Sequence, residues 1–305
     1  MNITERGLKT HNIEPDSLRV RPPFPKRVKI EITRKCDLKC YFCQRTYHKE
    51  NMGEIDRDFL YRILIELKSL GVEDVGLFWM GEPLLVQSLP EYVAFAKKIG
   101  IKYVFITTNG RLATPDRINK IIDSGLDSIK FSINGLKEKY LKLCGVDAFD
   151  QVISNLKNTW KYRGARKSLS IYASTIVDPA NKGEYDDIHS LIAPYVDLHY
   201  RIILYGKSKL EVKNGQYHIV STPEEEMKTL QSMLPCWALF TESHISYDGH
   251  MSACYCDLNE RFYVGDLNSM SIMEAWHSEK YVALRKQHLC KDVTGAVCES
   301  CNAYR

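Results

Sequence analysis

The stretch Glu31-Ile-Thr-Arg-Lys-Cys-Asp-Leu-Lys-Cys-Tyr-Phe-Cys43 decides how this chain is interpreted. Its three cysteines, Cys36, Cys40 and Cys43, have the spacing C-x3-C-x2-C, with no fourth cysteine nearby. Thiolates at such spacing suit an iron–sulfur cluster, which normally takes four cysteine ligands. Three protein ligands leave one iron open to a small molecule. The stretch therefore predicts a cluster that takes part in chemistry as well as carrying electrons.

A purely structural interpretation of the same cysteines is also open. Spacing i, i+4, i+7 lines one face of a helix, where buried cysteine is an ordinary small hydrophobic residue. The residues between the cysteines are mixed, however, and the strand-like run 28–33 comes directly before them. We therefore expect the cysteines in a loop at the C-terminal end of a strand. Cysteine clusters in an intracellular chain are more often metal-binding than structural.

The C-x3-C-x2-C pattern, with the aromatic residue Phe42 before its last cysteine, resembles the signature of radical S-adenosylmethionine (SAM) enzymes. The resemblance implies a catalytic [4Fe–4S] cluster whose open iron chelates the methionine amine and carboxylate of SAM. It also implies reductive cleavage of SAM and a 5′-deoxyadenosyl radical that abstracts a substrate hydrogen. Phe42 is counted with the cofactor-binding residues. The cofactors supply this chemistry, while the protein supplies orientation and exclusion of water.

The composition is that of a folded protein with room for two domains. Of the 305 residues, 44% are hydrophobic, which is enough for a full core. No apolar run reaches transmembrane length and no signal-peptide region is evident, so we expect a cytoplasmic protein that does not use a membrane. In that compartment ten cysteines favour clusters over disulfides. The 42 basic and 38 acidic residues are spread along the chain, which excludes a polybasic arm for nucleic acid.

Strand and helix signals alternate after a lead-in over residues 1–26. Strand-like runs lie near 27–33, 74–79, 103–108, 127–133, 169–177 and 197–204. Helix-like segments lie near 56–70, 88–99, 114–124, 149–163 and 184–193. Six such units predict an α/β fold with a parallel sheet and outer helices. They are too few for an eight-stranded barrel, and their number is that of the family's partial (β/α)6 barrel, here 27–204.

Two helix boundaries are marked by their end residues. The amphipathic segment that begins at Arg57 ends at Gly71, a C-terminal cap signal. The helix near 114–124 begins at the cap pair Thr114-Pro115 and stops at Gly125.

Short polar motifs follow the second and third strands, where a barrel of this type has its active site. Gly81-Glu82-Pro83 resembles the family's Gly-Gly-Glu-Pro motif, with Met80 in place of the first glycine. The resemblance implies that Gly81, Glu82 and Pro83 hold the methionine amine, and a carboxylate is the natural partner of an ammonium. Thr108-Asn109 resembles the family's Thr-Asn-Gly element near the cofactor. Each motif also makes an ordinary turn without any ligand.

A third motif, Ser132-Ile133-Asn134, ends the fourth strand. Many relatives carry Ser-x-Asp there, which binds the ribose hydroxyls or the carboxylate of SAM. Ser132 and Asn134 are therefore expected to be cofactor-binding, although an amide lacks the charge of a carboxylate.

A second set of cysteines follows a predicted linker, 205–235. Cys236 and Cys254 flank a hairpin with an Asp-Gly turn, and Cys298-Glu-Ser-Cys301 forms a terminal pair. With a helix over 271–286 between them, this order resembles the family's "twitch" or shortened SPASM auxiliary domain, here 236–305. The resemblance implies one auxiliary [4Fe–4S] cluster held by Cys236, Cys254, Cys298 and Cys301. Tetrahedral zinc on four cysteines is the alternative.

Three cysteines remain outside both sets. Cys144 is expected to be a buried, inert thiol, whereas Cys290 is either such a thiol or a ligand of the auxiliary cluster. Cys256 lies two residues beyond a proposed ligand, so that on a strand the two side chains would share a face. Cys256 is therefore a candidate catalytic hydrogen donor, or a replacement ligand.

The reaction class is better determined than the substrate. A barrel with a single auxiliary cluster resembles enzymes that oxidise or epimerise carbohydrates and aminocyclitols, and also enzymes that modify peptides or proteins. No peptide-recognition domain is evident, which favours a carbohydrate-like small molecule. A flavodoxin- or ferredoxin-type reductant is the implied partner. The non-enzymatic alternative is an iron–sulfur electron-transfer or sensing protein.

Overall fold

The computed structural model describes residues 6, 12–40, 42–43, 45, 52–165, 168–177, 183–203, 209–213, 216–220, 234–255 and 260–299. The chain divides into two compact units that are interleaved along the sequence. Unit 1 comprises Met1–Ile30, Asp56–Glu73 and Tyr205–Arg305, and unit 2 comprises Glu31–Ile55 and Asp74–Leu204.

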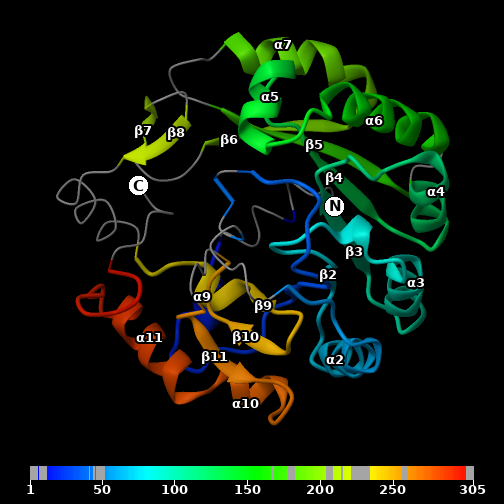
Figure 1. Ribbon diagram of the computed structural model, residues 1–305. Helices are drawn as coiled ribbons and strands as arrows, with labels where there is room; N and C mark the ends of the chain where they lie inside the picture. Colours follow the sequence, from blue (N-terminus) through cyan, green and yellow to red (C-terminus); the bar gives the residue numbers. More distant parts are fainter. Residues whose placement is uncertain are drawn as a thin grey trace. The chain divides into compact units, whose positions relative to one another are not determined.

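Unit 2 contains a parallel sheet whose strands follow one another in chain order. They are β2 (Asp74–Gly76), β3 (Tyr103–Thr108), β4 (Ser128–Ser132), β5 (Ser170–Val177) and β6 (Leu198–Ile203). The helices of this unit are α3 (Leu89–Lys98), α4 (Pro115–Asp123), α5 (Lys137–Cys144), α6 (Phe149–Arg163) and α7 (Gly183–Ile192). The predicted α/β class with an unclosed, mostly parallel sheet is confirmed (Figure 1).

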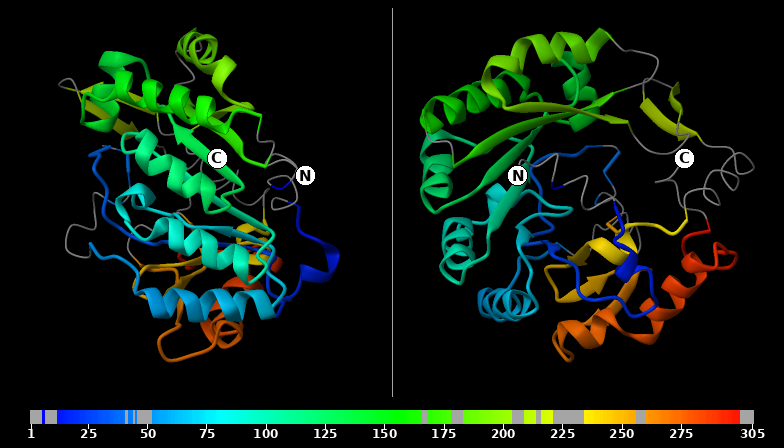
Figure 2. Two further views of the ribbon diagram at one scale, coloured as in Figure 1. Left: turned by 90° about the vertical axis from the view of Figure 1, so that its right-hand side faces the viewer. Right: turned by 180° about the vertical axis from the view of Figure 1, so that it is seen from behind.

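The two faces of the unit 2 sheet have different chemistry. Helices α3, α4, α6 and α7 lie along one face (Figure 2), where Ile129, Phe131 and Ile171 are fully buried. The opposite side chains form two register rows across β3–β6, which we call the polar face. It consists of Thr107, Lys130, Tyr172 and the apolar Leu198 in one row, and Ser132, Ser174 and Tyr200 in the next.

The predicted helix boundaries of α2 (Arg57–Ser69) and α4 are confirmed. The Asp56 carboxylate accepts a hydrogen bond from the Phe59 N–H at 2.8 Å and caps α2. Gly71 and Gly125 follow the two helices with φ of +81° and +99°, which a residue with a Cβ rarely adopts. Helix α5 was not predicted, because its sequence is rich in lysine and has no broad apolar stripe.

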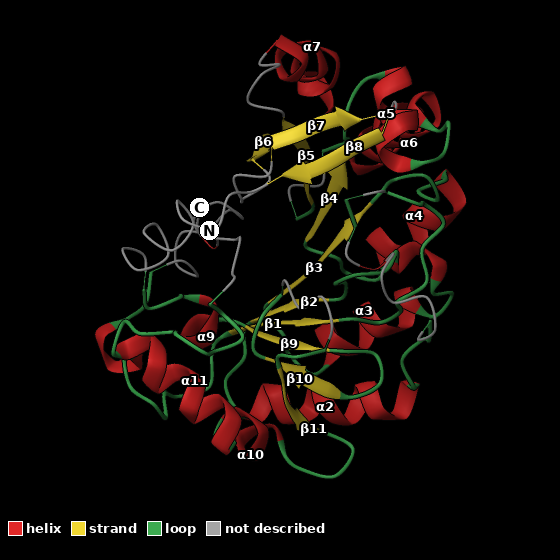
Figure 3. Cartoon of the chain, turned by 60° about the vertical axis from the view of Figure 1, so that its left-hand side comes forward, coloured by secondary structure: helices red, strands yellow, loops and turns green. Residues whose placement is uncertain are grey.

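Unit 1 contains a short mixed sheet. Strand β1 (Arg27–Ile30) pairs in parallel with β9 (Ser243–Ile245), which continues through β10 (His250–Ser252) to β11 (Tyr263–Asp266) in antiparallel steps. The predicted hairpin with an Asp248-Gly249 turn is confirmed as β9–β10. Its first arm is shorter than expected, because α9 (Ala238–Thr241) occupies the residues after Cys236. Strands β9, β10 and β11 lie side by side in Figure 3.

The helix predicted over 271–286 is wrong as a single element. The chain forms α10 (Ile272–Trp276) and α11 (Glu279–Leu289), because each begins at its own serine cap. The Ser278 hydroxyl accepts from the Tyr281 N–H while the Ser278 backbone is extended, which ends one helix and starts the next. A further antiparallel pair, β7 (Lys209–Lys213) with β8 (Gln216–Val220), lies within the predicted linker.

The lead-in residues are part of the core of unit 1. The Trp276 indole N–H donates to the Pro22 carbonyl at 3.1 Å, and the Trp276 ring packs against Phe24 and Tyr281 at centroid distances of 5.2 and 4.8 Å. Within the part of the chain that the structure describes, no helix has the length and apolar character that a membrane crossing requires.

Candidate active site and auxiliary site

The loop with the three early cysteines is closed at its base by backbone contacts. Ile55 N–H donates to the Ile32 carbonyl at 2.9 Å, and Arg34 N–H donates to the Gly53 carbonyl at 3.0 Å. The Arg34 side chain is fully buried and pairs with Glu31 at 3.0 Å. Residues 32–55 therefore form a loop with a rigid base, and the cysteines lie in its middle.

The three thiols sit in half-buried surroundings. Burial raises the pKa of Cys36 to about 12 and also raises the pKa of Cys43, while a hydrogen bond with Cys144, followed by burial, raises the pKa of Cys40. Metal ligation requires thiolates, so the positive charge of bound iron would have to offset this cost of deprotonation. Among the described residues, no three His, Cys, Asp or Glu side chains are arranged so that they could already hold a metal ion. The fit to a cluster therefore rests on the donor type and its surroundings.

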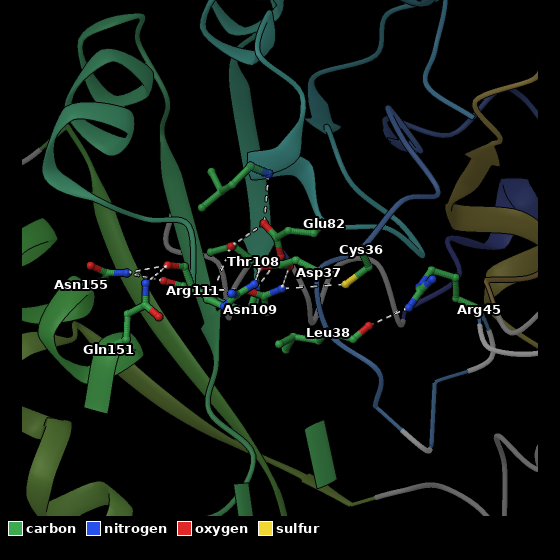
Figure 4. A network of polar contacts seen from close by, with 12 residues as sticks. Cys36, Asp37, Leu38, Arg45, Glu82, Thr108, Asn109, Arg111, Gln151 and Asn155 are labelled. Atoms are coloured by element: carbon green, nitrogen blue, oxygen red, sulfur yellow. Dashed lines mark hydrogen bonds and ion pairs between the residues drawn. The ribbon is translucent and has the colours of Figure 1, made fainter. Parts of the chain in front are cut away.

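Glu82 connects the turn after β2 to the end of β3 (Figure 4). One carboxylate oxygen accepts from the Leu84 N–H at 3.0 Å and from the Thr108 hydroxyl at 2.7 Å, and the other accepts from the Asn109 N–H at 2.7 Å. Burial raises the pKa of Glu82 to about 7, although these three hydrogen bonds lower it. A carboxylate has about four acceptor positions, so one remains for a ligand donor.

Asn109 joins this network to the cysteine loop. Its amide nitrogen donates to the Asp37 carboxylate at 2.7 Å and lies 3.9 Å from the Cys36 sulfur. Arg111 pairs with the other Asp37 oxygen at 3.0 Å (Figure 4). The structure thus brings together Cys36, Glu82, Thr108 and Asn109, as the sequence predicted. Sequence reasoning missed Asp37 and Arg111, since nothing local distinguishes them from ordinary surface charges.

Helix α6 holds the turn after β3 from its other side. The Asn155 amide donates to the carbonyls of Gly110 and Arg111, both at 2.9 Å, and Asn155 is itself buried. Gly110 has φ of +79°, and a Cβ there would lie 2.6 Å from the Phe131 ring. The turn is therefore fixed by packing as well as by hydrogen bonds.

Gly81 is required by close backbone contact. A Cβ at this position would lie 2.0 Å from the Thr33 carbonyl oxygen, and the Glu82 N–H donates to the Lys35 carbonyl at 2.8 Å. The motif thus packs its backbone directly against the base of the cysteine loop. Pro83 follows as the first residue of a short 3-10 helix, Pro83–Leu85.

Three further residues are predicted to bind the cofactor, namely Asn134, Ser132 and Phe42. Asn134 is buried, and its side-chain oxygen accepts from the Ile176 N–H at 3.1 Å, so it links the ends of β4 and β5. Ser132 is half-buried on the polar face, and Phe42 is half-buried in the cysteine loop.

Cys144 is buried, as expected, and it also contacts the cysteine loop. Its carbonyl accepts from the Lys39 N–H at 3.0 Å, and its thiol hydrogen-bonds Cys40. Tyr140, fully buried on the same helix, lies beside both thiols, and burial first and then the Cys144 charge raise its pKa. Helix α5 therefore packs two polar side chains against Cys40.

The second cysteine set surrounds helix α11 in unit 1. Cys236 is buried and its N–H donates to the His288 Nδ1 at 3.1 Å, while Cys254 is half-buried. Both thiols lie near the Tyr281 hydroxyl, where each raises the Tyr281 pKa further, after burial. Cys298 is buried, and Cys290 is exposed at the end of α11. Cys256 and Cys301 lie outside the described residues.

A buried ion-pair cluster crosses the β1–β9 pair of the same unit. The Glu242 carboxylate contacts Lys29 at 2.9 Å, Arg27 at 3.2 Å and His244 at 3.1 Å. Burial opposes ionisation, yet the two cations and His244 hold the pKa of Glu242 well below its usual range. The cluster therefore fastens the first strand to the hairpin that carries Cys254.

Comparison with known proteins identifies the class. The model of the Radical SAM superfamily matches residues 30–187, and that of SPASM, an iron-sulfur cluster-binding domain, matches residues 236–302. The chain belongs to the radical SAM superfamily and carries a C-terminal SPASM domain. These matches imply SAM, a catalytic [4Fe–4S] cluster and an auxiliary cluster as its cofactors.

Particular relatives differ in what they act on. A probable GTP 3′,8-cyclase of Saccharolobus islandicus (strain M.14.25 / Kamchatka #1) is 33% identical over 132 residues, 43% of this chain and 42% of that protein. The chain thus matches less than half the length of this relative. Solved structures with the same fold include BtrN in complex with AdoMet and 2-DOIA, with TM-score 0.57 at 18% identity, covering 92% of each chain. They also include Streptococcus suis SuiB bound to precursor peptide SuiA, with TM-score 0.69 at 18% identity, covering 96% of this chain and 74% of SuiB.

Proposed function

We propose that this protein cleaves SAM reductively and uses the 5′-deoxyadenosyl radical to abstract hydrogen from a C–H bond of a carbohydrate- or aminocyclitol-type small molecule. The observation that carries the proposal is the hydrogen-bonded chain from Cys36 through Asn109 to Glu82. It joins three separately predicted motifs at the ends of neighbouring strands. When bound, the catalytic cluster and SAM supply the radical.

The residues of the chain have distinct roles in this proposal. Cys36, Cys40 and Cys43 hold the catalytic cluster, and the free acceptor position of Glu82 receives the methionine ammonium. The backbone of Gly81 and Pro83 lines the amine site beside the loop. Asn109 orients the loop through Asp37, to which it donates at 2.7 Å. Thr108, Phe42, Ser132 and Asn134 complete the proposed cofactor site.

The polar face supports a polyhydroxylated substrate. Apart from Ser132, which is assigned to the cofactor, and the apolar Leu198, its members supply one amine and four hydroxyls in two adjacent rows, and such groups match a ligand with several hydroxyls. BtrN, which was solved with 2-DOIA, matches this chain over 92% of both lengths. SuiB, which was solved with a precursor peptide, has the higher TM-score of 0.69, so a peptide substrate is the second candidate.

We propose that the substrate is oxidised rather than epimerised. The substrate C–H hydrogen atom passes to the deoxyadenosyl radical, the hydroxyl proton passes to water, and one electron passes to the auxiliary cluster, leaving a ketone. Cys236, Cys254, Cys298 and Cys301 are the proposed ligands of that cluster. Cys256, as a thiol hydrogen donor, would instead return a hydrogen atom and give the epimer.

The experiment is anaerobic turnover of deuterated candidate substrates, with the label followed into 5′-deoxyadenosine. The panel contains aminocyclitols, hexoses and amino sugars, together with GTP and a cysteine- or lysine-containing peptide as competitors. Label transfer from a carbohydrate-type substrate supports the proposal, whereas transfer from the peptide alone contradicts it. Cys256→Ala then separates the outcomes. Under oxidation it keeps both clusters and forms ketone, and under epimerisation it abstracts hydrogen without forming inverted product.

A further inference from the structure

Helix α11 carries three polar side chains in the core of unit 1. Tyr281, Arg285 and His288 are each no more than 1% exposed. Their spacing of four and then three residues places them on one face of the helix. Burying such groups is costly unless each donor finds an acceptor. The hydrogen-bond partners of these side chains therefore indicate which kind of ligand would be bound beside α11.

Arg285 is a buried cation without an anion. Its guanidinium lies 3.9 Å from the Trp276 ring centre and 3.7 Å from that of Tyr281. It donates to the carbonyls of Leu239 at 2.9 Å and Trp276 at 2.7 Å, and it also interacts with the Tyr281 hydroxyl. Burying a charge is costly, and burial lowers the pKa of Arg285 to about 10, with no described carboxylate acting against it.

His288 and Tyr281 each have a donor to spare. Because the His288 Nδ1 accepts from the Cys236 N–H at 3.1 Å, its ring proton must lie on Nε2. In the described part of the chain, the His288 Nε2 has no hydrogen-bond partner. The Tyr281 hydroxyl interacts with the Arg285 guanidinium, which can only donate, so the Tyr281 O–H proton is still available. The Tyr281 hydroxyl also lies near the thiols of both Cys236 and Cys254. Tyr281 and His288 thus lie beside proposed auxiliary ligands, and Arg285 packs on the Tyr281 ring.

We propose that Tyr281 and His288 line the auxiliary cluster as positioning residues, donate hydrogen bonds to its sulfur atoms and raise its reduction potential, while Arg285 holds the Tyr281 hydroxyl in place. The inference rests on the proposed function, since it takes Cys236 and Cys254 as ligands. A cluster with four thiolates is an anion whose sulfur atoms accept hydrogen bonds, as these donors require. Net charge and hydrogen bonds to sulfur are among the factors that set cluster potentials. A higher potential suits a cluster that must receive an electron from the substrate.

The test measures the auxiliary cluster alone, in the full-length Cys36→Ala/Cys40→Ala/Cys43→Ala protein. Tyr281→Phe removes only the hydroxyl, and His288→Asn keeps an acceptor for the Cys236 N–H while removing the second donor. Tyr185→Phe is the matched control, because its buried hydroxyl donates to the His199 carbonyl at 2.9 Å in unit 2. Each protein is reconstituted with iron and sulfide and titrated potentiometrically with detection by electron paramagnetic resonance. Exchangeable-deuterium couplings of the reduced cluster are measured in D₂O.

We expect Tyr281→Phe and His288→Asn each to keep about four irons and to shift the reduction equilibrium about tenfold toward the oxidised form, which is 59 mV for one electron. Each also loses one deuterium coupling, while Tyr185→Phe changes neither. Four irons with unchanged potential and couplings in both variants overturn the inference alone. If the parent protein holds no iron, or holds zinc instead, the proposed auxiliary cluster fails. If the variants lose iron, the side chains support the fold and the inference is wrong.

Discussion

The polar residues around Cys36 in unit 2 are hydrogen-bonded to one another, whereas those around Cys236 in unit 1 have donors left over. Glu82, Thr108, Asn109 and Asp37 use their oxygens and nitrogens within one network. On α11, by contrast, the O–H of Tyr281 and the Nε2–H of His288 remain without acceptors among the described residues. The first site is therefore preorganised by the protein itself, whereas the second, on the inference above, is completed by an anionic cluster. The two proposed cluster sites thus differ in kind, because one pairs its polar groups within the protein and the other would need a bound anion to pair its donors.

The largest expected effect comes from removing the thiols of unit 2. The Cys36→Ala/Cys40→Ala/Cys43→Ala protein should fall from about eight irons to about four and make no 5′-deoxyadenosine, because only the catalytic cluster is lost. Iron analysis and product chromatography measure both. Cys290→Ala, which removes an exposed thiol, is the control and should change neither. Continued formation of 5′-deoxyadenosine by the triple variant would show that the cluster is held elsewhere.

Removing the iron tests this difference between the two proposed cluster sites directly. Each buried donor left without an acceptor costs about 1–3 kcal/mol. We therefore expect amide hydrogen exchange on α11 and residues 236–254 to accelerate more than tenfold in the iron-free protein, equivalent to about 1.4 kcal/mol. Exchange at the ends of β3 and β4 should change little, since that network needs no ligand. Equal acceleration in both places would contradict the distinction.

Glu82→Gln tests whether the negative charge of the Glu82 carboxylate contributes to SAM binding. We expect SAM binding to weaken by about 1.5–3 kcal/mol, or about 10- to 150-fold, as for a hydrogen bond to a charged group. Calorimetry measures the affinity. Glu73→Gln is the matched control, because that carboxylate pairs only loosely with Lys26, at 3.9 Å. An unchanged affinity for SAM in Glu82→Gln would remove the proposed role.

The raised pKa of Glu82 predicts in which direction stability and SAM binding change with pH. The pKa of Glu82 is raised from 4.5 to about 7 by burial, so the folded carboxyl is protonated more readily than the unfolded one. Stability without SAM should therefore fall as pH rises from about 4.5 to 7. SAM binding should strengthen over the range around pH 7 in which the carboxyl ionises. Glu82→Gln should lose both trends, and their persistence in the variant would assign them to another group.

The smallest effect is expected for Asp37→Asn. The variant keeps the shape but weakens the contacts with Asn109 and Arg111, which should cost about 1–2 kcal/mol and lower the melting temperature by about 2–6 °C. Asp116→Asn is the control, because its exposed pair with Lys120 is worth at most about 0.5 kcal/mol. Thermal unfolding followed by circular dichroism compares them. Equal melting temperatures would mean that the loop is held by its backbone alone.

Features encoded locally could be predicted, and features that depend on distant contacts could not. The strand order and the turns at Glu82 and Asn109 follow from periodicity and turn residues. The pairing of Arg111 with Asp37 joins residues 74 positions apart, and no local pattern marks it. The burial of Cys144 could be predicted, but its contact with Cys40 could not, because that contact exists only after α5 packs. The break at Ser278 was missed because a serine inside an otherwise helical run is usually tolerated.

The buried face of α11 escaped prediction for a different reason. Sequence patterns assign charged and polar positions on a helix to solvent, so nothing in the sequence of α11 marks Arg285 and His288 as buried. Under the inference above, their burial serves a site that needs hydrogen-bond donors inside the core. At functional sites, residues are expected to depart from what local sequence patterns predict.

The interleaved order of the two units has a consequence for biosynthesis. Unit 2 is complete once residue 204 has been made, but β1 waits for β9, and Lys29 is 213 positions from its partner Glu242. At translation rates of about 5–20 residues per second, that interval lasts about 10–40 s. Throughout it the β9-facing edge of β1 is a strand edge available to other chains, the kind of surface that chaperones cover. The catalytic loop can thus be folded on the ribosome before the auxiliary domain has been translated.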